Sequence, residues 1–170
     1  MFSLSDASLI EARRNVPVGD DRVDQKIGIT PMVAENGDTY HGMAGDVEVL
    51  FHNDVKDRPV TLFPEPPMTV RQIRSAGQCV VDDGGVRGRD GVWLSADGRT
   101  LATSESSGSS QDLVFRDTRT CAKVTTIDVA GMQWRVAGRA LLLRADGAKA
   151  DRRVPLDAAC RPATPAKPRH

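Results

Sequence analysis

The chain has 170 residues, no formal net charge at neutral pH, and 39% hydrophobic and 27% charged residues, a composition typical of one soluble globular domain. A neutral chain lacks the basic excess that drives binding to nucleic acids or anionic membranes, and no apolar run is long enough to span a bilayer. Only 4% of the residues are aromatic, so the predicted core depends on aliphatic side chains.

Residues 1–44 are predicted to form a weakly structured N-terminal segment. Ser5 to Arg14 has the pattern of a short helix, because Ser5 is a suitable N-cap and an arginine pair closes the run. Such a helix needs to dock onto another element, because it is too short to persist alone. Residues 17–24 are charged and indicate a loop, and Ile27, Ile29 and Val33 predict a first short strand.

The clearest amphipathic strand runs from Asp46 to His52. Strict alternation predicts that Val47, Val49 and Phe51 face the core. The opposite side, predicted to face solvent, carries Asp46, Glu48, Leu50 and His52. Further strands are predicted at Pro59–Phe63, Met68–Ile73 and Gln78–Val81.

The stretch from Asp90 to Val129 indicates four short strands with turn residues at each joint. Asp97-Gly98 lies between two alternating runs and is a strong hairpin signal, because glycine adopts positive φ without steric cost. Ser104 to Ser110 contains no apolar residue and is predicted to be an exposed loop. Asp117 to Thr120 is predicted to turn the chain into the fourth strand. The remaining predicted strands are Met132–Val136, Ala140–Ala145 and an edge strand at Arg152–Leu156.

Part of this stretch is repeated further along the chain. Trp93 to Leu101 (WLSADGRTL) is echoed by Trp134 to Leu141 (WRVAGRAL), and a Val-Asp-Cys pattern ending at Cys121 recurs before Cys160. Repeats of about 40–45 residues with four strands each are typical of β-propeller blades. Residues 86–160 therefore resemble blades of WD-repeat and related bacterial propellers, which implies propeller-blade-like four-stranded meanders.

About three such units are fewer than the four blades of a small propeller. We therefore expect a partial propeller or sheets packed face to face as a sandwich. In a simple blade arrangement, equivalent cysteines of neighbouring blades lie too far apart for a disulfide, so idle thiols are the simplest expectation for Cys79, Cys121 and Cys160. The sequence leaves open whether two of them are joined, and a disulfide between any two would exclude that simple arrangement.

Candidate chemistry is sparse, because the chain contains only three histidines. The best constellation is His41 with Asp46, Glu48 and His52, a set that suits a transition metal or acid–base chemistry. The simpler interpretation is the polar face of a half-buried strand, so no metal site and no cofactor are predicted. Asp82 to Gly85 is predicted to be a plain turn, because it lacks the ligand spacing of a calcium-binding loop.

The sequence predicts an all-β, mostly antiparallel domain over residues 45–160, followed by a disordered tail at 161–170. We predict a non-catalytic binding or protein-interaction module that recognises another protein, with no nucleic-acid partner. The predicted recognition loops are Asp54–Arg58, Pro64–Pro67 and Ser104–Ser110. An inhibitor, an immunity-type protein and a surface antigen all fit. The alternative is a small metal-dependent enzyme that uses His41, Glu48 and His52.

The cellular location is predicted from the cysteines and the N-terminus. The first residues lack the charged and apolar regions of a secretory signal. A three-cysteine β protein is nevertheless typical of an oxidising compartment, so a periplasmic or secreted protein that begins after a removed signal is expected, with a cytoplasmic location as the alternative. The oligomeric state is left open.

Overall fold

The computed structural model describes residues 23–24, 26–32, 38–53, 60–64 and 67–163. These residues form three antiparallel sheets and no helix, which confirms the predicted all-β antiparallel fold. Among them no helix has the length and apolar character needed to cross a membrane. The helix predicted at Ser5–Arg14 and the end of the predicted tail lie outside the described residues, as do the predicted loop Asp54–Arg58 and residues 65–66 of the predicted loop Pro64–Pro67.

The first sheet has the strand order β2-β3-β4-β6-β7. Its strands are β2 (Thr30–Pro31), β3 (Thr39–Ala44), β4 (Val47–His52), β6 (Met68–Gln72) and β7 (Gly77–Val81). The predicted strands over residues 46–52, 68–73 and 78–81 are thereby confirmed. β3 pairs with β4 along its whole length, so regular structure begins inside the N-terminal segment, before residue 45.

The central sheet has the order β11-β10-β9-β8-β5. Its strands are β5 (Leu62–Phe63), β8 (Val86–Leu94), β9 (Thr100–Ser107), β10 (Ser110–Asp117) and β11 (Lys123–Asp128). The four consecutive strands predicted between Asp90 and Val129 are therefore confirmed. The predicted exposed loop at Ser104–Ser110 is wrong, because the strands continue through it and leave only Gly108 and Ser109 as the turn.

The third sheet has the order β1-β12-β13-β14. Its strands are β1 (Val23–Asp24), β12 (Met132–Ala137), β13 (Ala140–Ala145) and β14 (Arg152–Pro155). The predicted hairpin and edge strand are confirmed. The loop predicted up to residue 24 is wrong at its end, because Val23 and Asp24 pair with β12 and supply the fourth strand.

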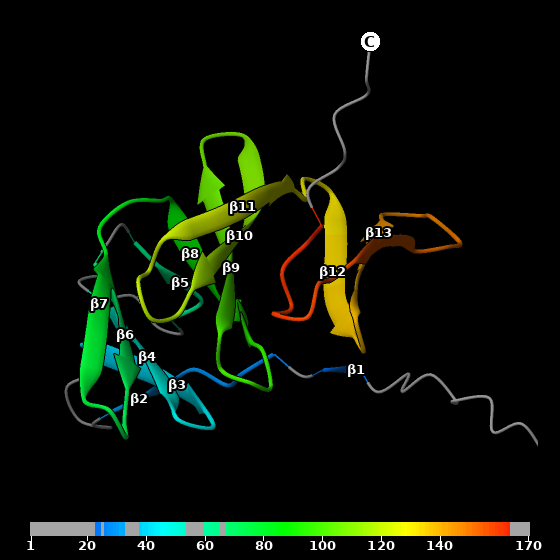
Figure 1. Ribbon diagram of the computed structural model, residues 1–170. Coiled ribbons are helices and arrows are strands. Elements are labelled where there is room, and N and C mark those ends of the chain that lie inside the picture. The colour runs from blue at the N-terminus through cyan, green and yellow to red at the C-terminus, as the bar shows by residue number, and fades with distance from the viewer. Residues whose placement is uncertain (1–22, 25, 33–37, 54–59, 65–66, 164–170) are drawn as a thin grey trace, which may run out of the picture.

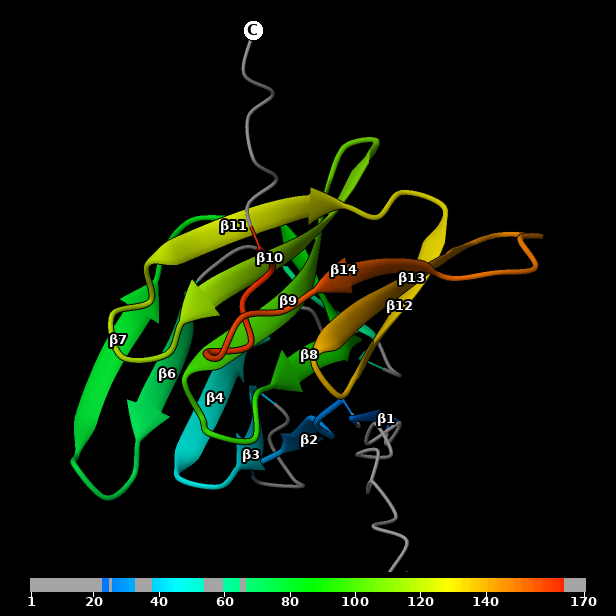
Figure 2. The same cartoon turned by 45° about the vertical axis from the view of Figure 1, so that its right-hand side comes forward.

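The central sheet is buried on both faces, since one outer sheet covers each of them (Figures 1 and 2). Val92, Leu94 and Leu101 pack with the first sheet, around a stack of Phe51 and Phe63 whose ring centroids are 4.6 Å apart. The opposite face packs against the third sheet through Trp93, Ala102, Leu113, Phe115, Trp134, Val136, Leu141 and Leu143. Alternation along each central strand thus places apolar side chains in two separate cores.

The predicted faces of β4 need one correction. Val47, Val49 and Phe51 are in the core, as predicted, but Glu48 and Leu50 on the opposite face are only 9% and 8% exposed. The reason is that β4 is the middle strand of its sheet. Side chains of β3 and β6 therefore cover its outer face, and one sequence cannot show which neighbours flank a strand.

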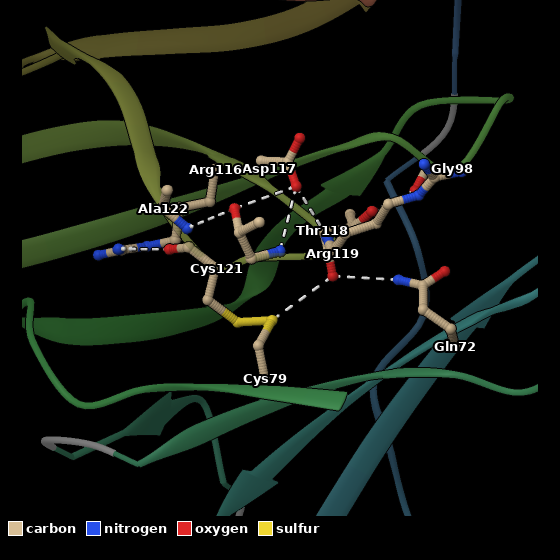
Figure 3. Close-up of a disulfide and its surroundings, with 10 residues drawn as sticks. Gln72, Cys79, Gly98, Arg116, Asp117, Thr118, Arg119, Cys121 and Ala122 are labelled. Atoms are coloured by element: carbon tan, nitrogen blue, oxygen red, sulfur yellow. Dashed lines mark hydrogen bonds between the residues drawn. A yellow bond between two sulfur atoms is a disulfide. The ribbon is translucent and has the colours of Figure 1, made fainter. Parts of the chain in front are cut away.

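Cys79 in β7 and Cys121 after β10 form a disulfide, with their Cα atoms 5.7 Å apart (Figure 3). The expectation of idle thiols is wrong for these two residues. The bond also shows that they do not occupy equivalent positions of neighbouring blades. Trp93 and Trp134 enter one shared core from two facing sheets, and none of the three sheets closes on itself. The resemblance of the remaining motifs to propeller blades stays a prediction.

Candidate protein-binding site

The structure brings together two of the four residues predicted as a candidate metal site. His41 Nδ1 lies 2.7 Å from Glu48 Oε1, and Arg71 Nη1 lies 3.7 Å from Glu48 Oε2. The register of β3, β4 and β6 explains this contact, because His41 lies opposite Leu50 and Arg71 lies opposite Glu48. Glu48 thus sits between two basic side chains, which give a largely buried carboxylate the polar partners that it needs.

The other two predicted residues have different surroundings. Asp46 Oδ1 accepts hydrogen bonds from the backbone N and the Nε of Arg74, at 2.9 and 3.2 Å. Glu48 and His52 are four residues apart on one strand, roughly 13 Å along it. Among the described residues no group of three His, Cys, Asp or Glu side chains is placed to hold a metal ion. The structure therefore offers no observation that favours the alternative of a metal-dependent enzyme using His41, Glu48 and His52.

A buried charge cluster, not predicted from the sequence, lies beneath the β9–β10 hairpin. Arg87 of β8, Glu105 of β9 and Arg116 of β10 are 1%, 5% and 2% exposed. Glu105 Oε1 lies 3.4 Å from Arg87 Nε and 3.8 Å from Arg116 Nη2, and it accepts a 2.9 Å hydrogen bond from the hydroxyl of Thr103. Burial lowers the pKa of Arg87, and Glu105 acts against that shift.

The loop at Asp82–Gly85 completes this cluster. Its Asp83 carboxylate lies 2.9 Å from Arg116 Nη2 and 3.3 Å from Lys123 Nζ. Burial acts to raise the pKa of Asp83, but Arg116 and Lys123 lower it overall. The amide of Gly85 donates to Glu105 Oε2 at 3.2 Å. The loop therefore ties β7 to the central sheet.

Above this cluster, the tip of the β9–β10 hairpin projects beyond its neighbours (Figure 1). β8 begins at Val86, opposite Ser106, and β11 ends at Asp128, opposite Asp112. The tip, residues 107–110, therefore extends past both flanking strands and is exposed. Gly108 has a φ of 59°, which suits glycine in a tight turn, and the hydroxyl of Ser110 donates to the carbonyl of Ser107 at 2.8 Å. These serines belong to the recognition loop predicted at Ser104–Ser110.

A hollow of about 420 Å³ opens at the base of the hairpin, between the central and third sheets. Trp134 forms its apolar wall and donates from Nε1 to Ser104 Oγ at 2.8 Å. Lys26 Nζ lies 4.0 Å from the centre of the Trp134 ring, a cation–π contact. Burial lowers the pKa of Lys26, and the charge of Asp90 opposes the change. Tip and hollow together provide hydroxyl, amide, aromatic and cationic groups, which are suited to recognising another protein.

Comparison with known proteins gives one family. The model of a family described as "Immune protein Tsi1" matches residues 25–159 of this chain. A relative named "Immune protein Tsi1", from Pseudomonas aeruginosa strain PAO1, is 43% identical over 98 residues. The matched region is 57% of this chain and 57% of the relative, so the alignment spans little more than half the length of the curated protein.

Proposed function

This chain belongs to the Tsi1 family of immune proteins, and from that premise we propose that it protects the cell that produces it by binding a protein toxin and blocking its action. An immunity-type protein acts through a partner protein, which agrees with the interaction module predicted from the sequence. That the partner is a toxin and that the hairpin contacts it are the parts that we propose.

The observation that carries the proposal is the projecting β9–β10 hairpin on a rigid base. Its tip exposes Ser107, Ser109 and Ser110, whose hydroxyl groups both donate and accept hydrogen bonds. Strand pairing on both sides and the buried charge cluster hold the base, so little conformational entropy remains to be lost when the tip binds. The neighbouring hollow with Trp134 adds an aromatic surface, and aromatic residues are enriched in binding hot spots.

We further propose that the protein acts in an oxidising compartment, the periplasm or the exterior of the cell. The Cys79–Cys121 disulfide supports this location, because such bonds are rare where thiols are kept reduced.

A growth-rescue assay tests the toxin-binding proposal. The partner is captured from a periplasmic extract of the source organism and expressed in the periplasm of a test bacterium. The captured partner should arrest growth when it is expressed alone, and growth should continue when this chain is co-expressed. Ser109→Arg should weaken the purified complex about thirtyfold or more, since a charged side chain at an interface centre costs about 2 kcal/mol. Ala148→Arg, on the exposed β13–β14 loop, is the matched control and should leave the affinity unchanged. A captured protein that is harmless when expressed would refute the proposal.

A further inference from the structure

A second hollow lies at the opposite end of β9 and β10 from the hairpin tip. Its volume is about 450 Å³, and it lies between the turn that joins β6 to β7 and the turn that joins β10 to β11. We call it the arginine hollow. It is lined by Asp46, Gln72, Arg74, Ser75, Gly77 and Arg119.

Contacts between distant parts of the chain hold the two turns in place. Gln72 Nε2 donates to the carbonyl of Thr118 at 3.0 Å, and the nearby disulfide joins β7 to the β10–β11 turn (Figure 3). The amide of Ile73 donates to the carbonyl of Asp46 at 2.9 Å. Ala76 closes the β6–β7 turn with a φ of 54°. This left-handed conformation is energetically unfavourable for a residue that carries a Cβ atom. The walls are therefore preorganised.

The acidic groups around the arginine hollow are engaged within the protein. Asp46 accepts from the backbone and the Nε of Arg74. Asp117 accepts from the amides of Arg119 and Thr120, at 2.9 and 3.1 Å. Burial would raise the pKa of Asp117, but these hydrogen bonds lower it overall. A partner entering the hollow therefore meets Arg119 and the guanidinium of Arg74, which shares a hydrogen bond with Asp46 through its Nε.

The cationic groups are accessible. The side chain of Arg74 is 86% exposed, and Arg119 is also exposed. Arginine is enriched at the centres of protein interfaces, so these two exposed side chains suit a protein-binding surface.

We propose that the arginine hollow is a second protein-binding surface, which takes an acidic segment of a partner protein. Guanidinium groups bind carboxylates through paired, charge-assisted hydrogen bonds, and two of them on facing walls select neighbouring carboxylates. A nucleic acid fits less well, because its binding requires cations along a row of phosphates, whereas two arginines and an aspartate line this hollow.

A peptide titration followed by NMR tests this surface on the full chain. The probe is the blocked peptide acetyl-Glu-Asp-Leu-Glu-Asp-amide, and its control is the uncharged acetyl-Gln-Asn-Leu-Gln-Asn-amide. The acidic peptide should shift amide signals of residues 72–77 and 117–120 in a saturable way, with a dissociation constant of about 1 mM. Raising the sodium chloride concentration to about 0.3 M should weaken binding, because salt screens exposed charges.

Matched variants distinguish peptide binding at the arginine hollow from binding at the hairpin tip. Arg119→Gln should weaken peptide binding about fivefold or more, whereas Arg153→Gln on β14 and Ser109→Arg at the hairpin tip should leave it unchanged. Undisturbed signals elsewhere show that the Arg119 variant is folded. Equal shifts with the uncharged peptide, or unchanged binding by the Arg119 variant, would overturn the proposal. So would tighter binding of a DNA oligonucleotide or of phosphatidylglycerol vesicles at the same residues. None of these results bears on rescue from the toxin.

Discussion

Removal of the Cys79–Cys121 disulfide is expected to lower the free energy of unfolding by about 4 kcal/mol. The bond closes a loop with a sequence separation of 42 residues, and the chain-entropy relation for a loop of that length gives about 4 kcal/mol at room temperature. It also joins an edge strand of the first sheet to a turn of the central sheet. In the unfolded chain, that link excludes many open conformations that the reduced chain visits.

Urea unfolding followed by tryptophan fluorescence measures this loss. The variant Cys79→Ala/Cys121→Ala should unfold at a midpoint about 2 M lower than the oxidised protein, with a slope of about 2 kcal/mol per molar urea. Oxidised protein treated with dithiothreitol should shift by a similar amount. Cys160→Ala is the control, because Cys160 is not part of the disulfide. A double variant within about 1 kcal/mol of the oxidised protein would refute the loop-entropy reasoning.

Three further predictions concern the buried charge cluster around Glu105, the left-handed backbone of Ala76, and the carboxylates of Asp97 and Asp117 that accept hydrogen bonds in their turns. Glu105→Gln should destabilise the protein by about 3–5 kcal/mol in urea unfolding, because it removes the carboxylate beside the buried Arg87 and one of the two beside Arg116; a loss below about 1 kcal/mol would contradict a buried ion cluster. Ala76→Gly should raise stability by up to about 1 kcal/mol, since glycine adopts a φ of 54° without strain, and a lower thermal midpoint would count against it. Hydrogen bonds from Ser95 and the amide of Arg99 lower the pKa of Asp97 overall, although burial acts to raise it. A carboxyl with a depressed folded pKa stabilises above its unfolded pKa and loses that contribution as the pH falls through the folded value. The Asp97→Asn and Asp117→Asn variants should therefore have a lower free energy of unfolding than the unmodified protein at about pH 6 and nearly the same value at about pH 2. The same loss of stability at both pH values would contradict a stabilising role for the ionised carboxylates.

The turn at Asp97-Gly98 shows why much of the fold could be predicted. Ser95 Oγ donates to Asp97 Oδ1 at 2.6 Å, the same oxygen accepts from the amide of Arg99 at 3.0 Å, and Gly98 has a φ of 68°. All of these contacts lie within five residues, so local residue types are sufficient to specify the turn. The strands on either side alternate for the same local reason.

The stretch at Ser104–Ser110 shows where local reasoning failed. Its polar composition indicates a loop, yet Glu105 is buried in a strand. A buried carboxylate is tolerated only when cationic partners surround it, and those partners come from β8 and β10. The candidate site could be predicted only in part for this reason: the serines of the hairpin tip were recognisable, but the charge cluster that supports them was not.

By itself, the sequence determined an antiparallel all-β chain with its main turns in place, because alternation and turn chemistry depend on near neighbours. Only the tertiary structure decided that Cys79 bonds Cys121 and that β4 is buried on both faces. It also decided that Arg74 and Arg119 line one hollow. Each of these features depends on which distant strands become neighbours, and that pairing is settled by packing across the two cores rather than by any short stretch of residues.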